Sequence, residues 1–98
     1  MGKFFPGAKG KHEMIGENKG LGFNIQFPFN LSKDEISEIG DLDYIYACEA
    51  FFFPIIRKFA PDLIIISAGF DSAKGDPLGG INITPAGFAW MTHGLMKI

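Results

Sequence analysis

The order of apolar and polar positions predicts two strands. Residues 22–27, GFNIQF, alternate between apolar and polar side chains, which is the period of a strand, and Pro28 ends the segment because it lacks a backbone donor. Residues 63–67, LIIIS, begin with four apolar residues in succession. Such a run is typical of a parallel strand buried on both faces. This second strand therefore requires helices above and below it.

Two helices are predicted between these strands. Ser32 and Glu35 have the spacing of a capping box, which predicts a short helix over 33–39. A longer helix is predicted over 41–60, with Asp41 as its N-cap, because apolar residues recur at spacings of three and four. Its first apolar stripe comprises Tyr44, Cys48, Phe51, Ile55 and Phe59, and its second comprises Leu42, Ile45, Phe52 and Ile56.

The remaining signals complete an α/β pattern. Pro54 is predicted to kink the long helix. The order strand, helices, strand, helix favours an α/β fold with right-handed crossovers. Two strands do not make a stable parallel sheet, so we expect the chain to be part of something larger. The last helix is predicted to have Thr84 as N-cap, Pro85 at its first position, and Phe88, Met91 or Thr92, and Leu95 facing inward.

Composition and charge exclude several functional classes. The 98 residues carry 11 acidic and 9 basic side chains, a formal charge of −2, so there is no basic field to hold nucleic acid or an anionic membrane. No apolar run approaches the roughly 18 residues that span a bilayer. The single cysteine, Cys48, excludes an internal disulfide and favours a reducing compartment, cytosolic or nuclear. Residues 1–22, rich in glycine, are expected to form an ordered loop.

One carboxylate stands where an α/β protein places its ligands. Asp71 follows the predicted strand at 63–67, and ligands in open α/β sheets bind beyond the carboxyl ends of the strands. Gly75, Gly79 and Gly80 give the loop its conformational freedom. Three roles are open to Asp71: binding a metal, acting as a general base, or holding its own loop by accepting backbone amides.

Three motifs resemble one family. The chain contains, in order, the motifs FFPG, KGLGFNI and PDLIIISAGFDSAKGDPLGGINITPAGF. These motifs are similar to the catalytic domain of zinc-dependent histone deacetylases of the class II, Hda1-like group. The resemblance implies an arginase/deacetylase-like α/β fold, with a three-layer αβα arrangement around a parallel sheet. Residues 1–98 would then be a C-terminal-half segment of that catalytic domain, and the rest of the domain would be the partner of this chain.

The resemblance also implies an activity and its site. The family hydrolyses acetylated lysine side chains of histones or other proteins with a zinc-bound water, in the nucleus or the cytoplasm. Asp71 matches the second aspartate ligand of the Zn²⁺, Phe5 an aromatic wall of the acetyl-lysine tunnel, and Leu78 a residue of the tunnel rim. Three protein ligands leave zinc an open position.

Other family residues have no match in this chain. The tandem histidines, the Asp-x-His segment with two zinc ligands, and the downstream residue that polarises the carbonyl are missing, so this chain alone is expected to be inactive. An acetylpolyamine amidohydrolase and a non-catalytic interaction module of the same fold remain alternatives. We expect His12 and His93 to lie at the surface, Cys48 to be a small buried side chain, and Asp76 to brace the 71–80 loop.

Overall fold

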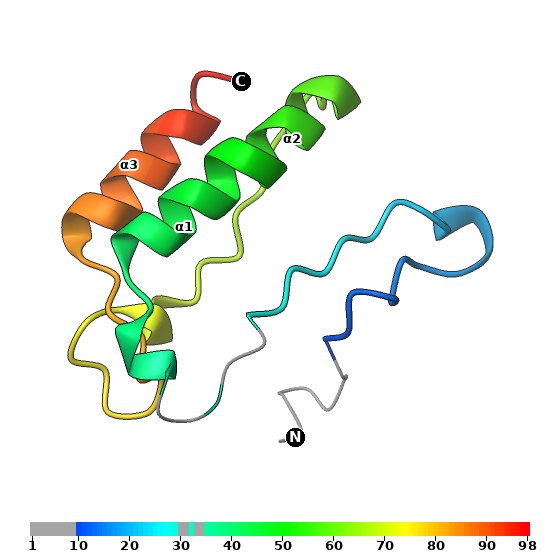
Figure 1. The fold of residues 1–98 in the computed structure, drawn as a ribbon. Coiled ribbons are helices and arrows are strands. Elements are labelled where there is room, and N and C mark those ends of the chain that lie inside the picture. The colour runs from blue at the N-terminus through cyan, green and yellow to red at the C-terminus, as the bar shows by residue number, and fades with distance from the viewer. Residues whose placement is uncertain (1–9, 30–31, 33–34) are drawn as a thin grey trace. The chain divides into compact units, whose positions relative to one another are not determined.

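The computed structural model describes residues 10–29, 32 and 35–98 (Figure 1). The chain divides into two compact units, residues 1–30 and residues 31–98, and each is described by itself. The candidate site residue Phe5 lies outside the described residues. Within the described residues, no helix has the length and apolar content to cross a membrane.

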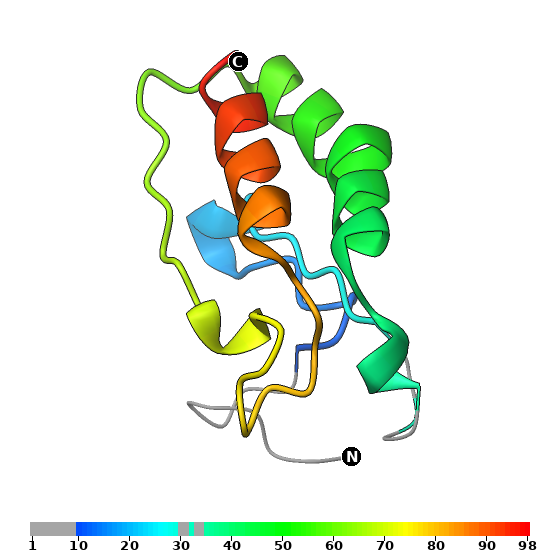
Figure 2. The ribbon, with the colours of Figure 1, turned by 90° about the vertical axis from the view of Figure 1, so that its left-hand side faces the viewer.

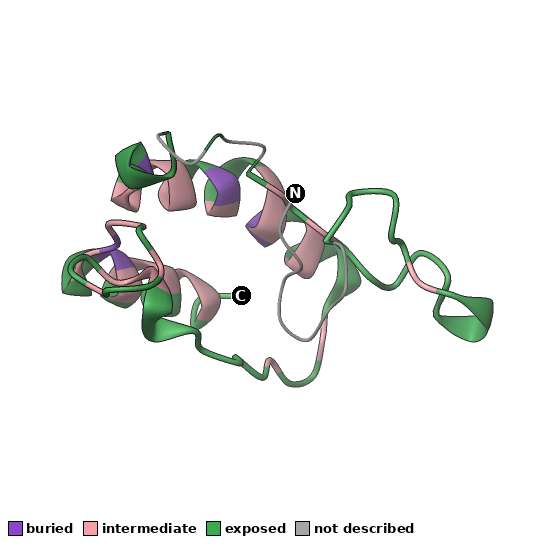
Figure 3. Ribbon diagram, turned by 90° about the horizontal axis from the view of Figure 1, so that it is seen from below, coloured by how far each residue is buried: buried purple, intermediate pink, exposed green. Residues whose placement is uncertain are grey.

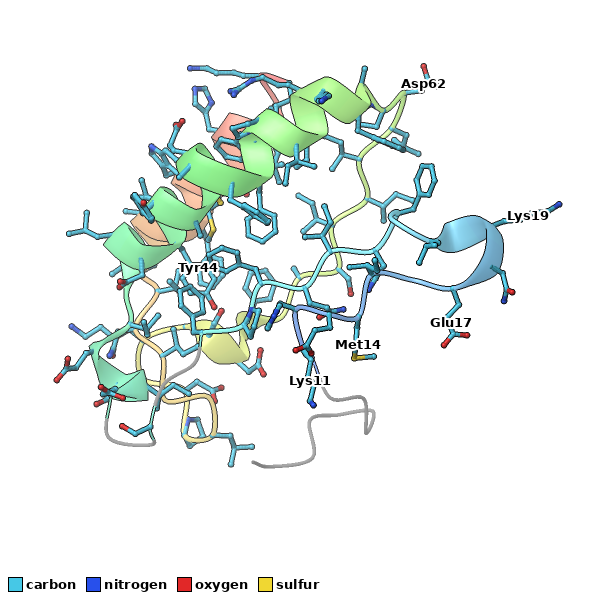
Figure 4. All side chains as sticks on the ribbon, turned by 45° about the vertical axis from the view of Figure 1, so that its right-hand side comes forward. Lys11, Met14, Glu17, Lys19, Tyr44 and Asp62 are labelled. Atoms are coloured by element: carbon cyan, nitrogen blue, oxygen red, sulfur yellow. The ribbon has the colours of Figure 1, made fainter. Side chains whose placement is uncertain are left out.

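The described part of the first unit, residues 10–29, is an ordered loop. Its one regular element among residues 10–29 is the 3-10 turn η1, Asn18–Gly20. Gly22 N donates to Ile15 O at 2.7 Å, and Asn24 Nδ2 donates to Met14 O at 2.7 Å, so the loop folds back on itself. The side chains of Lys11, Met14, Glu17 and Lys19 are exposed along it (Figure 4). The predicted loop is confirmed in its described part.

Neither predicted strand is formed. Residues 22–27 and 63–67 belong to no strand, and the β pairing among the described residues consists of two isolated parallel bridges, Gly40 with Asn82 and Ala73 with Ile83. A strand exists only through the ladder to its neighbour, and periodicity does not supply that neighbour. Residues 61–69 run as an extended connection instead (Figure 1).

A long helical segment in the second unit begins at Asp41, directly after Gly40. It consists of α1, Asp41–Ala47, the π-helical turn η3, Cys48–Phe52, and α2, Phe53–Phe59. The predicted N-cap was wrong: Gly40 is the cap, and Asp43 accepts from Gly40 N at 2.9 Å. Asp41 is therefore the first helical residue. The predicted disturbance at Pro54 takes the form of the π turn before it, since proline cannot donate to the preceding turn.

The capping box before this segment is confirmed, but its helix is shorter than predicted. Ser32 N donates to Glu35 Oε2 at 2.8 Å, and Glu35 N donates back to Ser32 Oγ at 3.4 Å. Among the described residues 35–39, the helical ones are those of the 3-10 turn η2, Ile36–Glu38. Residues 33–34 lie outside the described part of the chain.

Helix α3, Pro85–Leu95, packs along this helical segment and completes the core (Figure 2). Thr84 is its N-cap, as predicted, and accepts from Gly87 N at 3.3 Å. The side chain of Phe53 is 2% exposed and stacks on Trp90, with ring centroids 5.7 Å apart. The buried apolar residues among those described are Ile39, Ala47, Phe53 and Ile83.

The predicted faces of the helices need correction. Phe53 and Ala47 belong to neither predicted stripe, and the stripe residues Leu42 and Phe59 are exposed. A π turn holds more residues than an α turn, so Phe53 and Phe59, which lie beyond it, depart from the 3.6-residue spacing on which the stripes were drawn. Leu42 and Ala47 precede the turn, and their exposure and burial are set by the packing of α3 instead of by that spacing. On α3, the buried residue is Gly87, while Phe88, Met91 and Leu95 are half-buried and Thr92 is exposed. A glycine gives no apolar signal, so the contact face could not be found from periodicity.

Gly94 should tolerate no side chain. A Cβ atom at this position would overlap the Phe53 ring, lying 2.6 Å from Cε2. Overpacking of this kind costs about 1–3 kcal/mol, so we expect Gly94→Ala to lower the free energy of unfolding of the protein in urea, although alanine favours helices. In a Phe53→Leu background the ring edge is gone, and the same substitution should be neutral or stabilising. Equal losses in both backgrounds would contradict the predicted clash.

Large apolar side chains remain exposed on this chain. Leu63 is 74% exposed, Ile65 84% and Leu42 79%, and most described residues are exposed or half-buried (Figure 3). Apolar surface of this extent promotes association. We therefore expect the 98-residue chain, produced alone, to self-associate in sedimentation experiments. A well-folded monomer at micromolar concentration would contradict this prediction.

Candidate functional site

A short turn presents Asp71 at the end of the extended segment. This is the 3-10 turn η4, Phe70–Ser72, shown in yellow in Figures 1 and 2. Ser72 Oγ donates to Gly69 O at 3.0 Å, and Ala73 N donates to Phe70 O at 3.0 Å. Phe70 packs edge-on against Phe88 of α3, with ring centroids 5.3 Å apart. The turn is therefore held by contacts that do not use the Asp71 side chain.

The carboxylate of Asp71 is exposed. Among the described residues, no hydrogen bond or ion pair to its oxygens is found. It lies over a glycine: a Cβ atom at Gly69 would be 2.9 Å from Asp71 Oδ1. Asp41, Asp43 and Asp76 each accept a hydrogen bond from a backbone amide. Asp71 differs from these three aspartates, because its carboxylate accepts none from the described residues.

Asp76 braces the loop, as predicted. Its Oδ1 accepts from Leu78 N and from Gly79 N, both at 2.8 Å. The amide of Gly79, and then that of Leu78, lowers the pKa of this carboxyl below its ordinary value, because each bond favours the charged form. The loop-holding role that the sequence left open for Asp71 is thus performed by Asp76.

Gly79 brings the two ends of this loop together. A Cβ atom on Gly79 would overlap the carbonyl oxygen of Asp71 and lie 2.7 Å from its carbonyl carbon. The backbone of Asp71 therefore passes directly over Gly79. Leu78 immediately precedes Gly79 in the sequence. Leu78 is 92% exposed. Two of the predicted site residues, Asp71 and Leu78, are thus carried by one loop, whereas Phe5 lies outside the described residues.

Residues 82–84 connect this loop to the start of α1. Ile83 N donates to Ser72 O at 3.1 Å, and Lys74 N donates to Ile83 O at 2.9 Å. On the other side, Asn82 N donates to Ile39 O at 2.9 Å. Ile83 itself is fully buried. The segment therefore lies between residues 37–41 and residues 72–74 and is bonded to both.

Tyr44 is a neighbour of Asp71 that the sequence did not reveal. It lies on α1, half-buried, and its position on the helix is labelled in Figure 4. Burial raises the pKa of its phenol above the ordinary value, and the negative charge of Asp71 raises it further. Periodicity assigned Tyr44 to the core face of its helix, and its proximity to Asp71 arises from tertiary packing alone.

The other candidate side chains form no site in the described part of the chain. His12 is exposed and lies 3.6 Å from Glu13, and His93 is exposed on α3. Cys48 is half-buried, and burial, followed by the charge of Glu49, raises the pKa of its thiol. No group of three or more potential metal ligands occurs among the described residues. Asp71 is thus a single oxygen donor, which suits zinc as one ligand of several.

Known proteins resemble this chain over its whole length. Residues 1–98 match the histone deacetylase domain family. Histone deacetylase HDA1 of Candida albicans is 46% identical over 98 residues, covering 99% of this chain and 11% of that protein. Histone deacetylase clr3 of Schizosaccharomyces pombe is 43% identical over 98 residues, covering 99% of this chain and 14% of that protein. The chain therefore spans a small part of these relatives.

Solved structures agree with the path of the chain. The HDA15 HD domain superposes with a TM-score of 0.84 at 43% identity, covering 98% of this chain and 25% of that one. The structure of the histone deacetylase Clr3 gives a TM-score of 0.86 at 42% identity, covering 99% of this chain and 16% of that one. On the family match over all of its residues, the chain belongs to the histone deacetylase domain family.

Proposed function

We propose that this chain contributes one metal ligand and part of the substrate tunnel to a zinc-dependent enzyme that hydrolyses acetyl-lysine amides in histones or other proteins. The observation that carries the proposal is the Asp71 carboxylate, which a braced loop presents to solvent without using it for its own hydrogen bonds. Membership of the histone deacetylase family supports the class of reaction.

Asp71 would bind the zinc ion through its carboxylate. A bound zinc with three protein ligands would polarise the amide carbonyl and lower the pKa of a bound water to about 7. The chain's own contribution is to hold Asp71 in place, through the turn at Phe70–Ser72 and through Gly79 beneath its carbonyl. One carboxylate is fewer than the three ligands of a catalytic site, so this chain alone should be inactive.

Leu78 and Phe5 would line the tunnel for the acetyl-lysine side chain. Leu78 is nearly fully exposed beside the Asp71 backbone, and an apolar side chain there can pack on the aliphatic stem of a lysine. Phe5 would form an aromatic wall on the same stem. The proposal places the working enzyme in the nucleus or the cytoplasm, where acetylated proteins occur.

We further propose that residues 63–67, within the extended segment, become a buried strand in the complete domain, in a three-layer αβα fold. The superposition on two histone deacetylase structures supports this arrangement. The exposed side chains of Leu63 and Ile65 are the surface that such a sheet would cover.

The proposed substrate is tested by comparing two amides on the complete enzyme. Hydrolysis of an acetylated lysine peptide, lost on removal of zinc by a chelator and restored by added zinc, is the expected result. Hydrolysis of an acetylated polyamine alone would identify the enzyme as an acetylpolyamine amidohydrolase instead. Absence of both activities in a zinc-loaded protein would favour a non-catalytic interaction module.

A further inference from the structure

A single carboxylate links the first turns of two helices. Asp41 Oδ1 accepts from Thr84 N at 2.8 Å, and Asp41 Oδ2 accepts from Thr84 Oγ1 at 2.6 Å. These residues are 43 positions apart, so the contact is tertiary. Both bonds favour the charged carboxylate, the one from the Thr84 hydroxyl more than the one from its amide, and they lower the pKa of Asp41 below its ordinary value.

Three features around Asp41 favour its contact with Thr84. Capping of α1 is performed by Asp43, which accepts from Gly40 N at 2.9 Å, so Asp41 is not needed for its own helix. The Thr84 hydroxyl donates to Asp41 and accepts from Gly87 N at 3.3 Å, which fixes its direction. Gly87 leaves room for the carboxylate, because a Cβ atom there would overlap Asp41 Oδ1 and lie 2.7 Å from Cγ.

The contact extends to the loop that carries Asp71. Thr84 follows Ile83, whose backbone N donates to Ser72 O at 3.1 Å and whose carbonyl accepts from Lys74 N at 2.9 Å. Ser72 is the residue after Asp71. A displacement of Thr84 would therefore strain the two hydrogen bonds between Ile83 and residues 72–74, which hold the C-terminal end of the η4 turn. The backbone of Asp71, in the middle of that turn, contacts Gly79.

We infer that Asp41 is a positioning residue for the metal-binding loop: by fastening Thr84 it holds segment 82–84 against residues 72–74 and thereby fixes the orientation of Asp71. The inference rests on the proposed role of Asp71 as a zinc ligand. Supporting groups outside the ligand set commonly change metal affinity by about 10–100-fold when they are removed.

Four variants of the complete enzyme test the inference. Asp41→Ala removes both acceptors, Thr84→Val removes the hydroxyl at nearly constant shape, and Thr84→Ser retains it. Asp43→Asn is the matched control, because it removes a carboxylate charge from the same helical turn but keeps a side-chain oxygen that can accept from Gly40 N, the amide of the residue that pairs with Asn82. The first measurement is zinc affinity by competition with a chelator, and the second is amide hydrogen exchange in peptides covering residues 71–84.

The expected result separates positioning from general damage. Asp41→Ala and Thr84→Val should weaken zinc binding by about 10–100-fold and speed exchange over residues 71–84. Thr84→Ser should stay close to the wild type, and Asp43→Asn should change neither measurement. The inference is overturned when Asp41→Ala and Thr84→Val leave zinc affinity and exchange unchanged, or when Asp43→Asn has the same effects as Asp41→Ala.

Failure of the proposed function gives a different result. In that case Asp71→Asn would leave zinc binding unchanged, and the zinc measurements would no longer report on this loop. Hydrogen exchange would still decide whether Asp41 fastens it: faster exchange over 71–84 in Asp41→Ala, but not in Asp43→Asn, supports the fastening, and unchanged exchange refutes it.

Discussion

Asp71→Asn in the complete enzyme should abolish deacetylation and release zinc. A neutral amide is a poorer ligand than a carboxylate, and the loss should exceed the roughly 10–100-fold that supporting residues cause. The loop itself should keep its shape, because Asp76 and Gly79 hold it without the Asp71 side chain. Zinc content by elemental analysis and turnover on an acetylated peptide are the two measurements.

Asp62→Asn is the control for this variant. It makes the same chemical change at an exposed carboxylate, labelled in Figure 4, that directly precedes the proposed strand 63–67. Zinc content and turnover should match the wild type. Unchanged zinc content in Asp71→Asn would refute the ligand assignment, and with it the proposed chemistry of this chain.

Phe53→Ala should be among the most destabilising single substitutions in this chain. The ring is 2% exposed, stacks on Trp90 and lies under the Arg57 guanidinium, which is 5.8 Å from the ring centroid. Truncating a buried phenylalanine to alanine costs about 3–5 kcal/mol, since the cavity between two helices cannot fully close. The free energy of unfolding of the complete enzyme in urea measures the loss.

Phe53→Leu is the matched control for this prediction. It retains most of the volume, and a swap of that kind costs less than removal of the whole side chain. A loss for Phe53→Ala no larger than that for Phe53→Leu would show that the ring is not at the centre of the core.

Local signals in the sequence located the helices well. Thr84 followed by Pro85 marked the start of α3, and the apolar spacing after Asp41 marked the long helical segment, because caps and periodicity are local properties. The strands predicted at 22–27 and 63–67 are not formed in the structure, since a strand requires a partner that local sequence does not specify. The only sequence signal for the π turn was Pro54, which predicted a kink in the long helix.

The candidate site was accessible from sequence only in part. Asp71 was singled out by its place after the predicted strand 63–67, whereas its role as a metal ligand and the choice of Leu78 came from a resemblance; the structure places both residues on one loop. Asp41 was expected to cap its own helix, because an aspartate after glycine and before an apolar run has that signature. Its actual partner lies 43 residues away, and no spacing rule reaches that far. The role of Gly87 is likewise set by the carboxylate that approaches it.

The π turn Cys48–Phe52 bears on how this helical segment can change in length. Because the turn holds one residue more than an α turn, deleting a single residue from it would leave an ordinary α turn with both flanking helices facing as before. A deletion within Phe53–Phe59 would instead rotate everything beyond it by about 100°. Natural insertions and deletions in this helix should therefore gather at the turn before Pro54.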